Sequence, residues 1–159
     1  MSRGAGSPAT GAFTGTAANA VEVSISGGIL SLNRFLMTLQ NKRMPLKGFT
    51  LGRDREGLRA TVLLDCPEED ARRYTTVLAG LEDVKNTEAA NDALEVVLLK
   101  VSGVGWKESE AAGVSAHESG GTVVASGRPA DVAAWISGLE DVEDIVRLGP
   151  VARPGNGGD

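Results

Sequence analysis

The sequence predicts an α+β fold of two tandem domains, each ordered strand, helix, strand, strand, helix, strand. Two observations carry this prediction. The spacing of apolar residues changes repeatedly between the two-residue period of strands and the 3.6-residue period of helices. The pentapeptide Gly-Leu-Glu-Asp-Val occurs at 80–84 and again at 138–142, each time after a segment opened by proline. Because internal repeats indicate repeated structure, we expect the two halves to share one plan.

The first predicted strand covers residues 21–25, where apolar and polar residues alternate and Gly27-Gly28 then end the pattern. A helix follows, with four apolar residues at the spacing of one inward face: Leu32, Phe35, Leu36 and Leu39. We expect Lys42 and Arg43 in its last turn, where cations meet the negative end of the helix dipole. Pro45 should end the helix near Met44.

Residues 46–53 and 58–66 are predicted to form a hairpin around the turn at 54–57. Pro67 then suits the first position of a second helix, and the acidic residues at 68–70 suit its positive end. Together these elements give a four-stranded antiparallel sheet with both helices on one face, the ferredoxin-like arrangement. We expect Phe49 and Leu51 on the open face, which would require cover by another domain or subunit.

The second half repeats the plan with shorter elements. Residues 94–101 form a nearly continuous apolar run, which predicts a central strand covered on both faces. Residues 114–117 and 122–126 flank Gly120-Gly121 as a hairpin, and Pro129 opens a helix. The predicted organisation is a disordered arm at 1–19, a domain at 20–90, a second domain at 92–152 and a flexible tail at 153–159.

Composition excludes several classes of protein. A net charge of -5 and only six aromatic residues argue against nucleic-acid binding. No apolar run approaches the roughly 20 residues of a membrane span, so no membrane partner is expected. Cys66 is the single cysteine and the first residues lack the apolar core of a secretory signal, which predicts a cytoplasmic protein.

The residues needed for catalysis are scarce. With His117 as its single histidine and Cys66 as its single cysteine, the chain offers no catalytic triad and no multi-histidine metal site, so we predict no enzyme activity. The loop at Gly27-Gly28 precedes a helix whose free N–H groups suit a carboxylate ligand. Six cations are interpreted either as a solvated rim or as one binding patch: Lys42, Arg43, Lys47, Arg53, Arg55 and Arg59.

Two stretches carry a resemblance to a known family. Residues 32–39 (Leu-Asn-Arg-Phe-Leu-Met-Thr-Leu) through 46–51 (Leu-Lys-Gly-Phe-Thr-Leu) resemble the first helix and second strand of acetolactate (acetohydroxyacid) synthase small subunits. Residues 121–127 followed by 141–152 are similar to the C-terminal domain of that family and its closing strand. The resemblance runs in order from about Val21 to Pro154.

This resemblance implies an N-terminal ACT domain, a smaller C-terminal ferredoxin-like domain, and a homodimer joined through the ACT sheets. It implies a regulatory subunit of branched-chain amino-acid biosynthesis that binds and activates a catalytic (large) subunit. That partner would carry the thiamine diphosphate, FAD and magnesium, and this chain would hold no cofactor.

The resemblance also assigns the effector-binding residues: Gly27, Gly28, Ile29, Leu30, Pro45 and Leu46. In the ungapped register, the family's Asn-Glu-x-Gly falls on residues 27–30, so its asparagine and its glycine are both absent. Pro45 stands where the family has the asparagine that contacts the effector from the neighbouring subunit. We therefore expect a weak or altered valine response. The alternative is a stand-alone ACT-domain sensor of small molecules such as amino acids.

Overall fold

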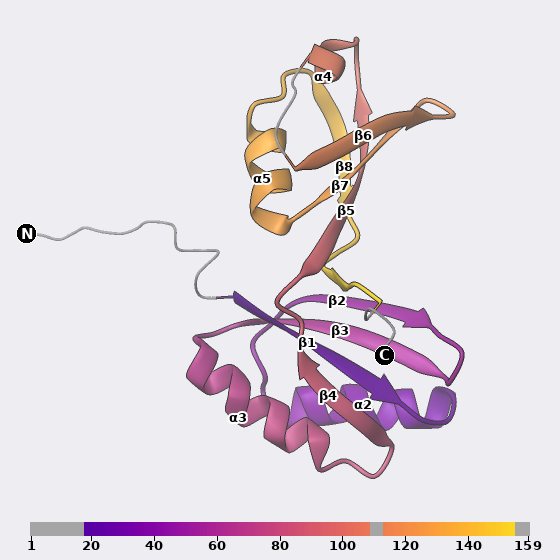
Figure 1. The fold of residues 1–159 in the computed structure, drawn as a ribbon, viewed down its shortest axis with the longest axis vertical. Helices are drawn as coiled ribbons and strands as arrows, with labels where there is room; N and C mark the ends of the chain where they lie inside the picture. Colours follow the sequence, from indigo (N-terminus) through magenta and orange to yellow (C-terminus); the bar gives the residue numbers. More distant parts are fainter. Residues whose placement is uncertain (1–17, 109–112, 155–159) are drawn as a thin grey trace, which may run out of the picture. The chain divides into compact units, whose positions relative to one another are not determined.

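The computed structural model describes residues 18–108 and 113–154. It confirms the predicted fold class, because two antiparallel sheets each carry helices in the tandem ferredoxin-like order (Figure 1). The chain divides between Asn91 and Asp92 into two compact units. Most of the predicted N-terminal arm, the segment at 109–112 and the tail beyond Pro154 lie outside the described residues.

The first unit contains a four-stranded sheet in the order β2-β3-β1-β4, with both helices on one face (Figure 1). Its elements are β1 (Ala18–Ile25), α2 (Ile29–Asn41), β2 (Leu46–Arg53), β3 (Leu58–Asp65), α3 (Glu68–Ala79) and β4 (Val84–Ala89). Since β1 begins at Ala18, the last two residues of the predicted arm belong to a strand. β1 lies between β3 and β4, and its Val23 pairs with Ala60 of β3 and with Thr87 of β4.

The core of this unit lies between the sheet and the helices, and Val23, Phe35 and Leu78 are at most 1% exposed. Cys66 is buried at the edge of the same cluster, as its interpretation as a small hydrophobic residue predicted. The predicted end of α2 was wrong, because the helix stops at Asn41, Lys42 is its C-cap and Arg43 follows in a left-handed conformation. Leu36 is 39% exposed, so it is not on the inward face.

The expectation that Phe49 and Leu51 lie on the open face was also wrong. Phe49 pairs with Val62, and its ring centroid lies 6.4 Å from that of Phe35 on α2. Leu51 pairs with the buried Ala60, and directly opposed residues share a face of the sheet. Both side chains therefore lie on the helix-covered face, and Leu51 is exposed because β2 is an edge strand.

The second unit has the sheet order β6-β7-β5-β8, and α5 packs on one face of this sheet (Figure 1). Its elements are β5 (Ala93–Val101), α4 (Gly105–Glu108), β6 (Val114–Ser119), β7 (Thr122–Gly127), α5 (Pro129–Ser137), β8 (Val142–Arg147) and β9 (Val151–Ala152), which pairs with the start of β5. Trp106 and Trp135 pack in the core. β5 is central, but the prediction that both its faces are covered was wrong, since Val96 and Leu98 are only half-buried.

The repeated pentapeptide has the same role in both units. Its glycine caps the helix before it, and its aspartate carbonyl accepts hydrogen bonds from a serine that follows the first strand. The Ser26 N–H donates to the Asp83 carbonyl at 2.8 Å, and the Ser102 N–H donates to the Asp141 carbonyl at 3.1 Å. The shared sequence thus marks a shared connection between the last and first strands of each sheet.

Candidate functional site

The loop between β1 and α2 contains the glycine pair at which the sequence analysis predicted a ligand carboxylate. Gly27 has a φ of 93°, a conformation that side-chain-bearing residues rarely adopt. Gly28 occupies the N-cap position of α2, and no side chain caps the helix there. The N–H groups of the first turn of α2 therefore have no capping side chain. Such uncapped N–H groups can bind a carboxylate.

The other predicted effector residues lie at both ends of α2. Ile29 and Leu30 form the first turn of the helix and are 76% and 71% exposed. Pro45 and Leu46 follow the C-terminal end of the same 13-residue helix, about 20 Å away at 1.5 Å per residue. Within one protomer, the structure therefore does not bring these two groups of residues together.

Beside the loop lies a hollow of about 220 Å³ that the sequence analysis missed. It lies between the N-terminal half of α2 and the turn that leads from α3 into β4. Its lining combines an apolar floor with polar and charged groups: Ile25, Ser31, Arg34, Phe35, Leu81, Glu82, Asp83 and Val84. The repeated pentapeptide supplies four of these residues, so the repeat was the available sequence signal.

An ion pair joins the two sides of this hollow. The Arg34 Nε donates to the Asp83 Oδ2 at 2.7 Å, and its Nη2 lies 2.5 Å from the same oxygen. The Asp83 carbonyl also accepts a hydrogen bond from the Ser26 hydroxyl at 3.1 Å. Asp83 therefore contacts both Ser26, which follows β1, and Arg34 on α2. Because the Arg34 side chain is 61% exposed, the ion pair itself contributes at most about 1 kcal/mol to stability.

Ser31 contributes a hydroxyl to the same hollow. It lies at the third position of α2 and is only 5% exposed. A Cβ added to Gly27 would lie 2.5 Å from the Ser31 Oγ, which shows how closely the loop backbone approaches this hydroxyl. Within the described ranges, 18–108 and 113–154, no group hydrogen-bonds to the Ser31 side chain. The hydroxyl is therefore available to a ligand.

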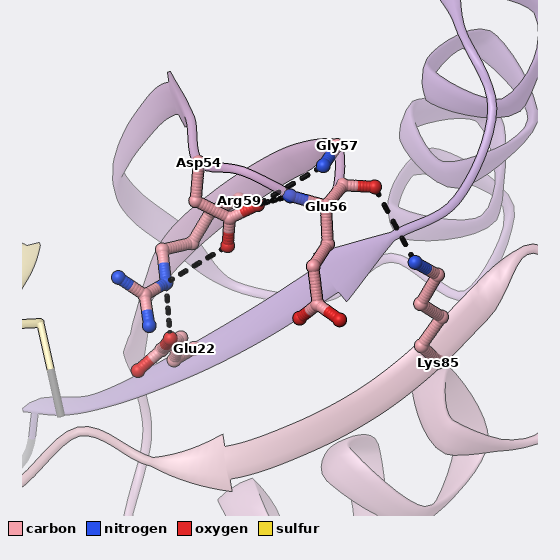
Figure 2. A network of polar contacts seen from close by, with 6 residues as sticks. All are labelled: Glu22, Asp54, Glu56, Gly57, Arg59 and Lys85. Carbon is pink, nitrogen blue, oxygen red and sulfur yellow. Dashed lines mark hydrogen bonds and ion pairs between the residues drawn. The ribbon is translucent and has the colours of Figure 1, made fainter. Parts of the chain in front are cut away.

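A polar network lies near the β2–β3 turn, on the face of the first sheet opposite the helices (Figure 2). Arg59 forms an ion pair with Glu22 and lies 4.0 Å from Asp54. The Asp54 carboxylate accepts the Glu56 N–H at 2.8 Å, and this hydrogen bond is the largest cause of its lowered pKa. These contacts fix the turn, and the ion pair with Glu22 offsets the charge of Arg59.

The six cations do not gather into one patch. Arg59 is paired within the network, and Lys47 and Arg53 are separated by six residues along β2, about 20 Å in an extended strand. Arg55 lies in the turn beyond Arg53. The arrangement favours the interpretation as a solvated rim. In the described part of the chain, no three His, Cys, Asp or Glu side chains are placed to hold a metal ion, and no helix there is long and apolar enough to cross a membrane.

Cys66 should react slowly while the first unit is folded. Burial raises the pKa of its thiol, and the nearby Asp70 and Asp65 carboxylates add to the shift. We expect a chromogenic disulfide reagent to modify Cys66 severalfold more slowly at pH 8 in the folded protein than in denaturing urea. The difference should narrow as the pH rises through the thiol pKa of the folded protein, because the thiolate is the reactive form. Equal rates in both conditions would contradict the buried position.

Comparison with known proteins supports the fold at low sequence identity. No protein-family model matches the chain, and no curated protein matches its sequence. The crystal structure of the acetolactate synthase small subunit from Thermotoga maritima is similar, with a TM-score of 0.65 and 16% identity over 83% of this chain and 93% of that one. An unknown protein from Galdieria sulphuraria matches with a TM-score of 0.38 and 15% identity, covering 82% of this chain and 96% of that one.

Proposed function

We propose that the chain is a non-catalytic regulatory subunit that binds and activates the catalytic subunit of a cytoplasmic acetolactate synthase. The observation that carries this proposal is the likeness to the Thermotoga maritima small subunit, which extends over both tandem domains and 93% of that chain. The resemblance of residues 32–39, 46–51, 121–127 and 141–152 to the same family is consistent with this proposal. Thiamine diphosphate, FAD and magnesium would all be held by the catalytic partner.

Two copies are proposed to pair through the exposed edge of β2. This strand ends the first sheet, and Leu46 and Leu51 on it are 47% and 42% exposed. Unpaired edge strands readily form hydrogen bonds with a second chain. Because Arg53 pairs with Leu58 and Leu58 with Ile25, the loop at 27–28 lies at the Arg53 end of the sheet. Antiparallel pairing of two β2 strands would bring Pro45 and Leu46 of a second copy to that end.

We propose that the dimer interface formed by two β2 strands responds weakly to valine. The exposed side chains of Ile29 and Leu30 would stand where a ligand must approach the backbone. These apolar residues suit contact with a protein surface better than contact with a carboxylate. We therefore expect activation of the catalytic subunit with little or altered feedback by valine.

Co-expression with the catalytic subunit from the same genome tests the proposal. With an affinity tag on this chain, we expect the catalytic subunit to co-purify and acetolactate formation to exceed that of the catalytic subunit alone. Assays with and without valine then measure the feedback. Absence of both co-purification and activation would reject the regulatory-subunit proposal.

The second candidate function is a stand-alone small-molecule sensor, which the hollow beside α2 favours. A ligand at 100 times its dissociation constant stabilises the protein that binds it by about 2.7 kcal/mol. A thermal-shift screen with amino acids should then give a clear rise in melting temperature even without any partner protein. A screen in which no amino acid raises the melting temperature would count against the sensor.

A further inference from the structure

We infer that the face of the second sheet opposite α5 is a dimer interface, where β5 and β8 pack against β8 and β5 of a second copy of this chain. The two helices α4 and α5 contribute Trp106 and Trp135 to the core on the other side of this sheet. The interface is separate from β2 of the first unit and requires no catalytic partner. The inference and the proposed function can therefore fail separately.

Alternation along the strands decides which side chains lie on this face. Val97 and Leu99 of β5 and Val123 of β7 belong to the core beside α5. Successive side chains of a strand point to opposite faces of its sheet, so Leu98 and Val124 lie on the face opposite α5. The registers, with the hydrogen bond from Leu148 to Val96, order this face in rows across β6, β7, β5 and β8: Ser115, Ser126, Val96 and Leu148; then His117, Val124, Leu98 and Val146; then Ser119, Thr122, Lys100 and Asp144.

The middle of this face is apolar. Leu98 and Val124 on the central strands are half-buried, and Val146 and Leu148 at the β8 edge are 47% and 43% exposed. Because directly opposed residues of neighbouring strands lie within reach of each other, these side chains and Val96 form one contiguous patch. Contiguous exposed apolar patches mark interaction sites. A second copy would supply the cover on both faces of β5 that its apolar sequence predicted, since one protomer covers a single face.

The charges on this face select a second copy as its partner. Lys100 on β5 and Asp144 on β8 are directly opposite each other, and their charges cancel. The chain as a whole has a net charge of -5, so two copies meet with least repulsion where the surface is neutral. Within residues 18–108 and 113–154, neither Lys100 nor Asp144 forms an ion pair, and both charges remain available to a partner.

A two-fold axis parallel to the strands, between β5 and β8, makes this face complementary to itself. Such an axis exchanges β5 with β8 and keeps each row in place. Lys100 of each copy would then lie over Asp144 of the other, and Leu98 would lie over Val146. Each contact occurs twice in a dimer of this symmetry. The apolar row would supply the buried surface, and the two ion pairs beside it would fix the register.

Carbodiimide cross-linking of the full chain tests this contact. The reagent forms an amide between a lysine amine and a carboxylate that are in contact. Unlabelled and nitrogen-15-labelled protein are incubated together until the copies exchange, and the linked peptides are analysed by mass spectrometry. A link that joins the two isotopes can form only between two copies. We expect such a mixed link between Lys100 and Asp144. Links between these residues that are confined to one isotope would overturn the inference, as would their absence.

Val146→Asp and Ile145→Asp form a matched pair on β8. Both add one carboxylate to the same edge strand, but Ile145 pairs with Leu99 and so lies on the face of α5, where it is 38% exposed. We expect Val146→Asp to lower the yield of the mixed link at least about fivefold and Ile145→Asp to change it less than about twofold, because only Val146→Asp buries an unpaired charge in the interface. Equal yields in the two variants would contradict the assigned face. Melting curves confirm that both variants are folded.

A charge exchange tests the two-fold arrangement. Lys100→Asp or Asp144→Lys alone would place like charges over each other, and each should weaken association roughly tenfold. The two substitutions combined restore opposite charges and should recover most of the affinity. Sedimentation velocity over a range of concentrations measures the association, since neither single variant can form the link. A combined variant that associates no better than the single variants would overturn the arrangement.

Discussion

Replacing Phe35 with alanine is expected to destabilise the first unit by about 3–5 kcal/mol, because the substitution removes a large buried side chain and leaves a cavity. Phe35 is 1% exposed, and it connects α2 to β2 through its contact with Phe49. Urea denaturation followed by far-UV circular dichroism measures the loss. Tryptophan fluorescence separates the two units, since Trp106 and Trp135 are the only tryptophans and both belong to the second.

The neighbouring residue provides the control for this substitution. Leu36→Ala changes the same helix at a position that is 39% exposed, so it should cost no more than about 1 kcal/mol. The two variants together test which side of α2 faces the core. A similar loss of stability in both would contradict the orientation of the helix.

The sequence predicted the order of the elements well because the period of the apolar residues changes between strands and helices, and because turn residues separate the strands of each hairpin. It could not predict which of two neighbouring residues of α2, Phe35 or Leu36, faces the core. Phe35 and Leu36 both fit an inward stripe that begins at Leu32, and the sheet beneath the helix decides between them. In the structure, Leu32, Phe35 and Leu39 contact the core and Leu36 does not.

The face assigned to Phe49 shows a second limit. Alternation along β2 indicates that Phe49 and Leu51 share a face, but it does not say which face the helices cover. That depends on the pairing of β2 with β3, which includes an irregularity between Leu46 and Gly48. A shift of one residue in the pairing of two strands moves every side chain of a strand to the other face of the sheet. The face of Phe49 can therefore be predicted only when the register between β2 and β3 is known.

The candidate site was predicted only in part. The loop at Gly27-Gly28 follows from adjacent residues, and a glycine pair between a strand and a helix is visible in the sequence. The hollow combines Ser31 and Arg34 with Asp83, which is 49 residues from Arg34 along the chain. Only the packing of the turn against α2 brings them together, and no local pattern encodes that contact.

Replacing Gly127 with alanine is expected to destabilise the second unit by about 1–3 kcal/mol, although it adds a single methyl group to a strand. An added Cβ would overlap the Gly113 carbonyl oxygen and lie 3.3 Å from its carbon and 3.4 Å from the Val114 Cα. These are backbone atoms of Gly113, which precedes β6, and of Val114, the first residue of β6, so a rotamer change cannot relieve the clash. To accommodate the methyl group, the backbone at 113–114 must move away from β7, which would weaken the pairing of Val114 with Gly127.

Tryptophan fluorescence during urea denaturation measures this loss directly, because both tryptophans report the second unit. Gly105→Ala is the matched control in the same unit. An added Cβ at Gly105 meets no atom within 4 Å, and Gly105 is the first residue of α4, where alanine gains only part of the roughly 1 kcal/mol by which it is favoured over glycine in a helix interior. Gly105→Ala should therefore leave stability unchanged or slightly raised. If Gly127→Ala were equally neutral, β6 would not pair with β7 as closely as the register of Val114 with Gly127 requires.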